Sequence, residues 1–296
     1  MNKNQPSLRF PAVALFSLGK QLELARIMDH KAIVSFQTKI MDWWSRNARQ
    51  LPWREDPSPY NVLVSEIMLQ QTQVNRVVSK YLEFLQEFPT IEALASADTK
   101  HLLSVWSGLG YNRRAVWLRE AAQSIIRMGG FPRTVEQLRK LKGIGPYTSR
   151  SILIFAFNED LATVDTNIRR VFIASGFADE STSDSNLQDI ADELLLRGNS
   201  RDWHNALMDY GSEVLTSTVT GIAPTSTQPQ FLGSTRQIRG MIIRELTNTE
   251  SLTLHEMKIK LKDNSIDNEQ LREVLNQLIQ DGLVKQVARN AYSIAT

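Results

Sequence analysis

The sequence contains no cysteine, and this excludes several kinds of chemistry at once. Without thiols the chain cannot form disulfides, use a thiolate nucleophile, or hold zinc or an iron–sulfur cluster through cysteine. The four histidines are scattered and lack the spacing of metal ligands (His30, His101, His204 and His255). The sequence therefore predicts neither a metal site nor a cofactor.

Long apolar runs are also missing. No stretch of about eighteen apolar residues occurs, so we expect no membrane-spanning helix and, by default, a cytoplasmic protein. Residues 1–27 show little pattern and are expected to form a poorly ordered extension, with Met28 as an alternative start. From Lys31 to Leu215 apolar residues recur at helical spacing and strand patterns are absent, which predicts an all-α fold.

Charge is absent from residues 216–235, which contain nine Ser or Thr, two Pro and two Gly. This composition is typical of a linker. Beyond it, residues 236–296 predict three helices followed by two short strands, the order of a winged-helix-like α+β domain. Because this tail carries nine basic and eight acidic residues, its charge suits a DNA contact no better than a protein contact or a packing role.

Basic charge is concentrated in one part of the chain. Residues 101–150 contain nine Lys or Arg against two acidic residues, although the whole chain has a formal net charge of only +2. A local basic face of this kind is expected of a DNA-binding protein.

The same region contains the turn Gly143-Ile144-Gly145-Pro146, which follows a predicted helix over residues 134–141. Both glycines are expected to take backbone angles that other residues avoid, and Pro146 suits the first turn of a new helix. Such a hairpin presents free backbone N–H groups at a helix N-terminus, where a phosphate binds well. Taken alone, the turn could also be a plain helix–helix connection, with Asp165 as an ordinary N-cap.

Two carboxylates are candidates for breaking an N-glycosidic bond in DNA. That reaction needs an extruded base, a proton for the leaving base and a negative charge near the developing sugar cation. Glu66 lies on a mostly apolar predicted helix, where desolvation would raise its pKa, and Asp165 follows the hairpin helix. By spacing alone, Glu66 could also be an ordinary exposed helix residue.

Three motifs carry a family resemblance: residues 65–72 (Ser-Glu-Ile-Met-Leu-Gln-Gln-Thr), 51–54 (Leu-Pro-Trp-Arg) and 106–111 (Trp-Ser-Gly-Leu-Gly-Tyr). With the hairpin and Asp165 they closely resemble MutY-type adenine DNA glycosylases of the helix-hairpin-helix/Gly-Pro-Asp (HhH-GPD) superfamily. The resemblance runs from about Lys31 to Gly211. It implies a two-lobed glycosylase domain over residues 28–215. One six-helix lobe would span about 56–164, and the other would combine 28–55 with 165–215.

The resemblance also implies roles for individual residues. Glu66 matches the acid that protonates adenine, Asp165 the carboxylate that stabilises the sugar cation, and Asn167 an amide that positions them. Tyr147 stands where bifunctional relatives carry a Schiff-base lysine, so we expect base removal without strand cleavage; Lys142 lies close but off the matching position. Positions matching the base pocket are Arg49, Leu51, Trp53, Arg54 and Leu69. Positions matching DNA contacts are Gln70, Gln71, Tyr111, Gly143, Ile144, Gly145 and Thr148, with Gln71 and Tyr111 as wedges. Trp53 and Tyr111 could instead be plain packing residues.

The chain departs from the family pattern in three places. The four-cysteine iron–sulfur cluster is replaced by the charge-free residues 216–235, and the Nudix-like domain that reads 8-oxoguanine by the winged-helix-like tail. Thr166 stands where the family often has glycine, and it would strain any backbone that needs a positive φ. Adenine removal is therefore expected more firmly than 8-oxoguanine recognition.

The sequence thus predicts a monofunctional base-excision-repair glycosylase that removes adenine opposite G or 8-oxoguanine. We expect it to act as a monomer on mismatched or damaged double-stranded DNA, in the cytoplasm and associated with the nucleoid. A mismatch thymine or uracil glycosylase is the nearest alternative, because that relative also carries a tyrosine in the hairpin. A catalytically silent DNA-binding protein is the alternative of another class.

Overall fold

The structure is a computed structural model of the chain, and it describes residues 30–225, 230–261 and 266–295. The extension predicted for residues 1–27 lies outside the described residues. By packing, the chain divides into a unit that ends at Asn47 and a unit that begins at Ala48. In the first unit the structure describes one amphipathic helix, α2 (His30–Asn47).

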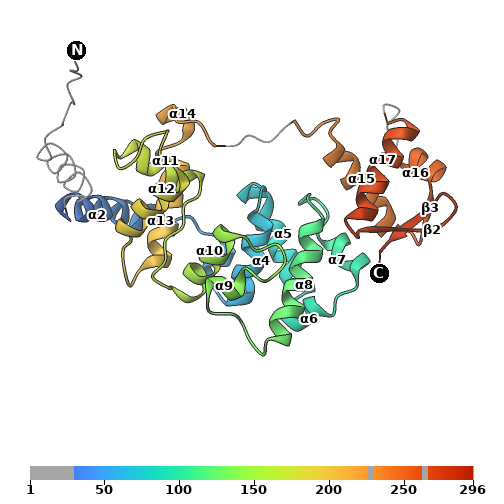
Figure 1. Cartoon of the computed structure of the whole chain (residues 1–296), viewed down its shortest axis with the longest axis horizontal. Helices are drawn as coiled ribbons and strands as arrows, with labels where there is room; N and C mark the ends of the chain where they lie inside the picture. The colour runs from blue at the N-terminus through green and yellow to red at the C-terminus, as the bar shows by residue number, and fades with distance from the viewer. Residues whose placement is uncertain (1–29, 226–229, 262–265, 296) are drawn as a thin grey trace, which may run out of the picture. The chain divides into compact units, whose positions relative to one another are not determined.

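The second unit begins with helices alone, as the sequence predicts (Figure 1). Several of these helices start at a side chain that accepts a backbone N–H, as at Ser58, Thr90, Asp98 and Thr134. The helices are α3 (Pro52–Glu55), α4 (Pro59–Leu69), α5 (Val74–Glu87), α6 (Ile91–Ala95), α7 (Thr99–Val105), α8 (Arg113–Arg127), α9 (Val135–Leu138), α10 (Pro146–Phe157), α11 (Thr166–Ala174), α12 (Asp184–Glu193), α13 (Ser200–Glu213) and α14 (Ser217–Thr220).

Helix α4 is the centre of this arrangement. It packs against α5, α8 and α10, and it is apolar on nearly every side. Leu63, Val64, Ile67 and Met68 are each at most 1% exposed. A helix that is apolar all round is stable only when buried, so the composition of residues 59–69 dictates its place in the core. Glu66 is consequently an acidic residue within an apolar helix.

Helices α11 and α13 pack directly on one another and support the residues around Asp165. Ile168 and Phe172 of α11 are buried, and so are Trp203 and Leu207 of α13. The burial of these four apolar side chains stabilises the pair and holds the N-terminus of α11 in place.

The C-terminal part consists of α15 (Thr235–Thr247), β1 (Leu252–Thr253), α16 (Leu254–Leu261), α17 (Asn268–Gln280), β2 (Val284–Ala288) and β3 (Ala291–Ile294). The strands form an antiparallel sheet in the order β1-β3-β2, with Leu252 opposite Tyr292 and Val284 opposite Ile294. The predicted three helices and hairpin are therefore confirmed. Strand β1 was not predicted, because two residues are too short to show a period of two.

Three expectations from sequence need correction or completion. The helix predicted over 134–141 is the short α9, which ends at Leu138. The segment predicted as linker contains the helical turn α14, and its residues 226–229 are not described. Thr166 is the first residue of α11 and does not have a positive φ, so the expected strain is absent. No described helix has the length and hydropathy needed to cross a membrane.

Candidate active site

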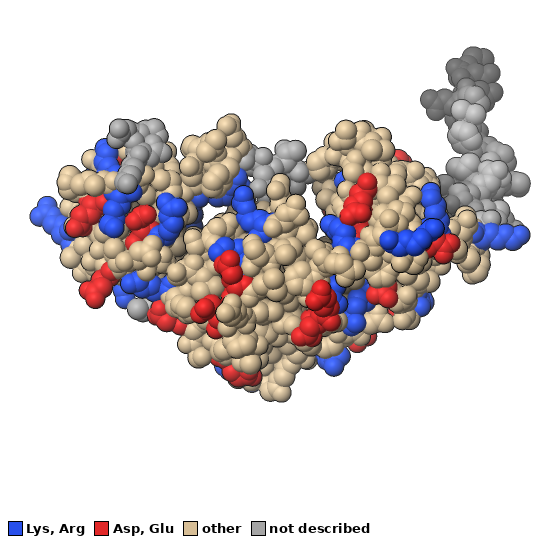
Figure 2. All heavy atoms as spheres, turned by 180° about the vertical axis from the view of Figure 1, so that it is seen from behind, with Lys and Arg blue, Asp and Glu red and all other residues tan. Residues whose placement is uncertain are grey.

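The basic stretch over residues 101–150 divides into surface and interior side chains. Arg114 is buried, while Arg119 and Arg150 bond to backbone carbonyl groups. The other six remain exposed (Arg113, Arg127, Arg133, Arg139, Lys140 and Lys142). On the face seen in Figure 2, Lys and Arg side chains border a recess between the winged-helix part and the helices that precede it. The surface charge of this stretch is therefore smaller than the sequence count, but still basic.

The predicted phosphate hairpin is present between α9 and α10. Gly143 has a φ of +76°, and a Cβ there would lie 3.2 Å from Trp117, so this position needs glycine for its conformation and for space. Gly145 differs from the prediction, because it is the N-cap of α10 and adopts extended backbone with a φ of −91°. Only one of the two glycines is thus required by the turn. Pro146 begins α10, as predicted, and leaves the amides of its first turn without helical partners.

Gln70 connects this hairpin to the end of α4. Its Nε2 donates to the carbonyl oxygen of Gly143 at 3.1 Å and to the hydroxyl of Thr148 at 3.2 Å. The side chains of Ile144 and Thr148 are buried. These inward-facing side chains position the hairpin, and its backbone remains the part able to bind a phosphate.

The two predicted wedge residues share an unusual backbone conformation. Gln71 has a φ of 56° and Tyr111 a φ of 47°, the left-handed region that non-glycine residues adopt rarely. Such residues cost about 1–3 kcal/mol each and are concentrated at functional sites. Tyr111 is also 36% exposed, so part of its ring is open to a ligand. Both turns therefore carry strain at the positions predicted to enter DNA.

Arg114 ties the two strained turns together. Its Nη1 donates to the carbonyl oxygens of Ile67, Met68 and Gln70 at 2.5–2.9 Å. Its Nη2 donates to Leu109 and Gly110 at 3.2 and 3.1 Å. Burial lowers the pKa of Arg114 to about 10, so the side chain remains cationic at neutral pH. One buried guanidinium group thus donates hydrogen bonds to the carbonyl groups that precede both wedge residues, Gln71 and Tyr111.

Glu66 projects from α4 toward α10, where Ser151 is its hydrogen-bonding neighbour. Burial raises the pKa of Glu66 to about 7, and the negative charge of Asp165 acts in the same direction, whereas Ser151 opposes it. A carboxyl group with this pKa is substantially protonated at neutral pH, as a general acid requires.

Asp165 is the N-cap of α11. Its Oδ1 accepts the N–H of Ile168 at 2.7 Å, and its Oδ2 accepts the side-chain amide of Asn167 at 2.9 Å. Burial raises the pKa of Asp165, while these hydrogen bonds and the charge of Arg170 lower it. The carboxylate is thus held in one orientation by donors that favour its ionised form.

Asn167 is oriented in turn by Arg170. The Nη2 of Arg170 donates to the Oδ1 of Asn167 at 2.7 Å, which leaves the Asn167 amide to face Asp165. Arg170 also donates to the carbonyl oxygens of Gly211 and Leu215 at the end of α13. The end of α13 therefore determines the orientation of Asp165 through two intervening side chains.

Tyr147 lies in the first turn of α10 and interacts electrostatically with both Glu66 and Asp165. Although the side chain as a whole is 36% exposed, desolvation of its hydroxyl group and these two acidic neighbours raise the pKa of Tyr147 well above its usual range, so the phenol is neutral. Tyr147 and Asp165 line a cavity of about 380 Å³ together with Arg150 and Arg169. Glu66 does not line this cavity. Glu66, Asp165 and Tyr147 are therefore close enough to affect one another's pKa, and Asp165 and Tyr147 lie at an open cavity.

The residues predicted for the base pocket have varied surroundings. Arg49 and Arg54 both bind Asp209, whose side chain is fully buried, with Nε–Oδ1 at 2.5 Å and Nη1–Oδ2 at 2.8 Å. Leu51 and Trp53 belong to the hydrophobic core, and the Trp53 ring lies edge-on to Tyr81 at 5.5 Å. Leu69 is partly buried against that core and lines a surface pocket with Gln71 and Tyr111. A contact between these residues and an extruded base stays a prediction.

Sequence analysis did not identify four residues that hold this site: Arg114, Arg170, His204 and Asp209. His204 is buried, its Nε2 accepts the N–H of Thr163 at 3.1 Å, and its Nδ1 donates to Ser200 at 2.7 Å. Each of them binds at least one partner 40 or more positions away, and local sequence patterns contain no signal for those contacts.

Comparisons with known proteins agree with this geometry. The family model of the HhH-GPD superfamily base excision DNA repair proteins matches residues 64–196. The adenine DNA glycosylase of Mycobacterium tuberculosis (strain H37Rv) is 33% identical over 285 residues, covering 87% of this chain and 92% of that protein. A thermostable thymine-DNA glycosylase superposes with a TM-score of 0.57 at 27% identity, covering 63% of this chain and 88% of the other. Endonuclease III from a non-covalent DNA complex has a TM-score of 0.58 at 17% identity, covering 67% and 91%, which shows a shared fold.

Proposed function

The chain belongs to the adenine DNA glycosylase family of the HhH-GPD superfamily of base excision DNA repair proteins, and we propose that it hydrolyses the N-glycosidic bond of a mispaired adenine in double-stranded DNA. The proposed mispair is adenine opposite G or 8-oxoguanine. The observation that carries the proposal is the pairing of Glu66 and Asp165: one carboxyl group has a pKa near 7, and the other is held by three donors. Two carboxyl groups in such different surroundings can divide acid and charge-stabilising work.

In the proposed reaction the adenine leaves the base stack and Glu66 protonates it, so that the base departs neutral. Asp165, fixed by Asn167 and the N–H of Ile168, stabilises the oxocarbenium-like sugar by its negative charge. After the bond between the sugar C1′ and the base nitrogen has broken, a water molecule adds to C1′ and gives its proton to the Glu66 carboxylate, which restores the acid. No step requires an iron–sulfur cluster, and we propose that the contacts of Arg170 with the end of α13 support the second lobe without one.

Strand cleavage is not part of the proposed reaction. Tyr147 stands in the hairpin helix, and its neutral phenol cannot form a Schiff base with the sugar. The product is therefore an intact strand with an abasic site, which breaks only after alkali.

A panel of end-labelled duplexes tests this function, with A:G, A:8-oxoG, T:G and U:G mispairs and alkali added afterwards. We expect cleavage at A:G, at A:8-oxoG, or at both, only after alkali. Breaks confined to T:G or U:G would instead favour the thymine or uracil reaction, which is supported by the similarity to a thymine-DNA glycosylase. Base release from no duplex would favour a silent DNA-binding protein.

Two variants connect the activity to the named residues. Glu66→Gln and Asp165→Asn keep the size of each side chain but remove the acid or the negative charge. We expect base release to fall by at least about 100-fold in each, as for loss of a general acid or an electrostatic stabiliser. Duplex binding should persist, and loss of binding together with activity would show misfolding.

The proposed partner is mismatched or damaged DNA of the nucleoid, bound by one copy of the chain. Light scattering with and without duplex is expected to give one chain per duplex; two chains per duplex would contradict a monomeric enzyme.

A further inference from the structure

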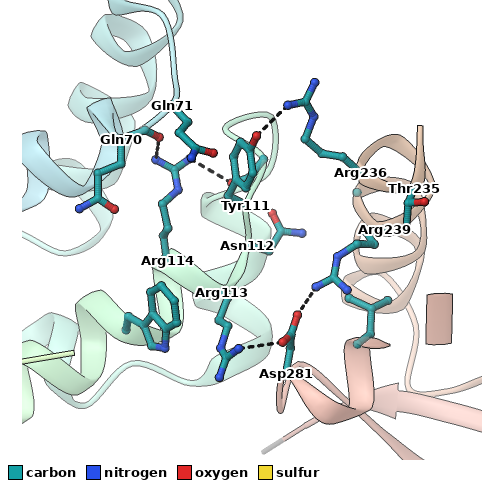
Figure 3. Close-up of a pocket in the computed structure, with 14 residues that line it drawn as sticks. Gln70, Gln71, Tyr111, Asn112, Arg113, Arg114, Thr235, Arg236, Arg239 and Asp281 are labelled. Carbon is teal, nitrogen blue, oxygen red and sulfur yellow. Dashed lines mark hydrogen bonds and ion pairs between the residues drawn. The ribbon is translucent and has the colours of Figure 1, made fainter. Parts of the chain in front are cut away.

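A groove of about 670 Å³ lies between the wedge turns and the winged-helix part (Figure 3). One wall is formed by Gln71, Tyr111 and Trp117 of the glycosylase helices. The other is formed by α15 and the end of α17, including Arg239 and Asp281. The groove therefore begins at the residues predicted to enter DNA and continues along a domain to which the proposed reaction assigns no role.

Arginine side chains contact two aromatic rings along this groove, through a hydrogen bond and through cation–π interactions. Arg236 donates to the Tyr111 hydroxyl from Nη1 at 2.7 Å, and its guanidinium lies 5.4 Å from the centre of the Tyr111 ring. Arg113 lies 5.0 Å from the centre of the Trp117 ring. The walls thus combine flat apolar surfaces with guanidinium groups, a combination that suits a nucleic-acid strand, whose bases stack and whose phosphates are anionic.

Positive charge exceeds negative charge in the groove. Asp281 bonds to Arg113 at 2.9 Å and also to Arg239, as Figure 3 shows. Among the described residues that line the groove, Arg113, Arg236 and Arg239 are exposed or partly exposed, and Asp281 is the only carboxylate. Arg114 also lines the groove, but its donors are directed to backbone carbonyl groups. The formal charge of these lining residues is therefore positive, which favours an anionic ligand.

The helix that most winged-helix proteins would present to DNA is poorly suited here. Helix α17 is the third helix of the domain. Its N-cap Asp267 is exposed, and the exposed positions in its first two turns include Glu269 and Glu273 against Arg272. Acidic residues in this number repel the phosphates that flank a major groove. The N-terminal half of α15, with Arg236 and Arg239, is the better DNA-facing surface.

We propose that this groove binds the sugar–phosphate backbone of the DNA strand that passes the Tyr111 turn, with Arg236 and Arg239 as phosphate contacts. The proposal rests on the proposed function for the presence of a duplex at the hairpin. The winged-helix-like part would thus be a second DNA-binding surface in addition to the hairpin. Its Arg236 contacts Tyr111, one of the two predicted wedge residues. Arg239 exchanges its bond with Asp281 for one with a phosphate, and Arg236 keeps Tyr111 in place while contacting the strand.

The full-length chain tests the proposal with a fluorescein-labelled duplex that carries a non-hydrolysable 2′-fluoro-2′-deoxyadenosine opposite G. The dissociation constant is measured by anisotropy over a range of KCl concentrations. We expect Arg236→Gln and Arg239→Gln each to reduce the slope of log K against log salt by about 0.9, the effect of one lost phosphate contact. Arg244→Gln is the matched control, because Arg244 lies at the other end of α15 and pairs with Glu245. It should leave the slope unchanged.

Asp281→Asn separates phosphate binding from simple attachment of the domain. This variant breaks the ion pair that Arg239→Gln breaks, and the pair of Asp281 with Arg113 as well, but it leaves every arginine in the groove. We expect its slope to stay the same or to increase and its binding to tighten, because an anion has been removed from the DNA surface. Unchanged slopes in both arginine variants would overturn the proposal, and so would a slope lowered equally in Arg239→Gln and Asp281→Asn.

The proposed function and this inference can fail separately. Wild-type base release on the A:G or A:8-oxoG duplex tests the function, and the salt slopes test the groove. Adenine release with unaltered slopes in the variants would retain the enzyme and remove the second DNA-binding surface.

Discussion

Gly211 of α13 packs directly against the backbone of Asn167, so closely that a Cβ on Gly211 would lie 2.8 Å from the carbonyl oxygen of Asn167. The contact is with backbone and cannot be relieved by turning a side chain. Because Asn167 donates to Asp165, the spacing of two helices is transmitted to the candidate catalytic carboxylate.

Gly211→Ala should therefore impair both stability and base release. The two helices must separate by several tenths of an ångström, which costs about 1–3 kcal/mol as overpacking and displaces Asn167. We expect a lower melting temperature and at least a tenfold lower single-turnover rate. Gly240→Ala in α15 is the control, because a Cβ there meets no atom within 4 Å. It should be neutral or stabilising, and equal behaviour of both variants would contradict the packing argument.

Replacing Arg114 should loosen both wedge turns. Arg114→Met keeps the apolar stem but leaves the carbonyl groups of Gln70 and Gly110 without this donor. We expect a loss of about 3 kcal/mol or more in the free energy of unfolding, because several buried acceptors lose a charged donor. Chemical denaturation measures it. Arg127→Met on the same helix removes an exposed side chain that bonds only locally to Ser124 and should change stability by less than about 0.5 kcal/mol.

The pKa of Glu66 near 7 predicts a pH dependence of base release. If the protonated carboxyl group is the acid, the single-turnover rate should decline as pH rises through about 7. A flat profile between pH 6 and 8.5 would argue against Glu66 as the proton donor.

The same pKa makes a prediction about stability. Since the pKa of Glu66 in the folded state lies above its usual value of 4.5, the folded chain keeps a proton that the unfolded chain loses, and stability falls as pH rises from about 4.5 to about 7. Glu66→Gln cannot ionise, so it should be more stable than wild type at pH 8, by at most about 3 kcal/mol. Denaturation curves at pH 5 and pH 8 give the difference. A variant destabilised equally at both values would indicate lost packing only.

His204 should give the opposite dependence. Burial lowers its pKa from 6.5 to about 4, because the ring is enclosed between Thr163 and Ser200. Between about pH 6.5 and pH 4 the unfolded chain therefore binds a proton at His204 that the folded chain does not bind. The free energy of unfolding consequently decreases as pH falls from about 6.5 toward 4. The loss amounts to about 3 kcal/mol over this range. His204→Gln should flatten that part of the stability curve, and an unaltered acid limb would assign the loss to other groups.

Much of the fold could be predicted locally. The helical period, the side-chain caps and the glycines and prolines between the helices depend on neighbouring residues, so α4, α8 and α10 and the winged-helix order followed from the sequence. Boundaries were less accurate where the last turn depends on packing, as at α9, which ends three residues before the predicted limit. Strand β1 exists only through its pairing with β3, a partner about 40 residues away.

For the candidate site, the sequence by itself determined which chemical groups are available. The chain has no thiol. It has the two candidate catalytic carboxyl groups of Glu66 and Asp165, a tyrosine where bifunctional relatives carry a lysine, and a hairpin able to bind phosphate. Tertiary structure decided what those groups can do. The pKa of Glu66 depends on burial in α4 and on Asp165, and the orientation of Asp165 depends on Arg170 and the end of α13. Desolvation and long-range hydrogen bonds arise only when distant segments pack together, so no pattern of neighbouring residues contains them.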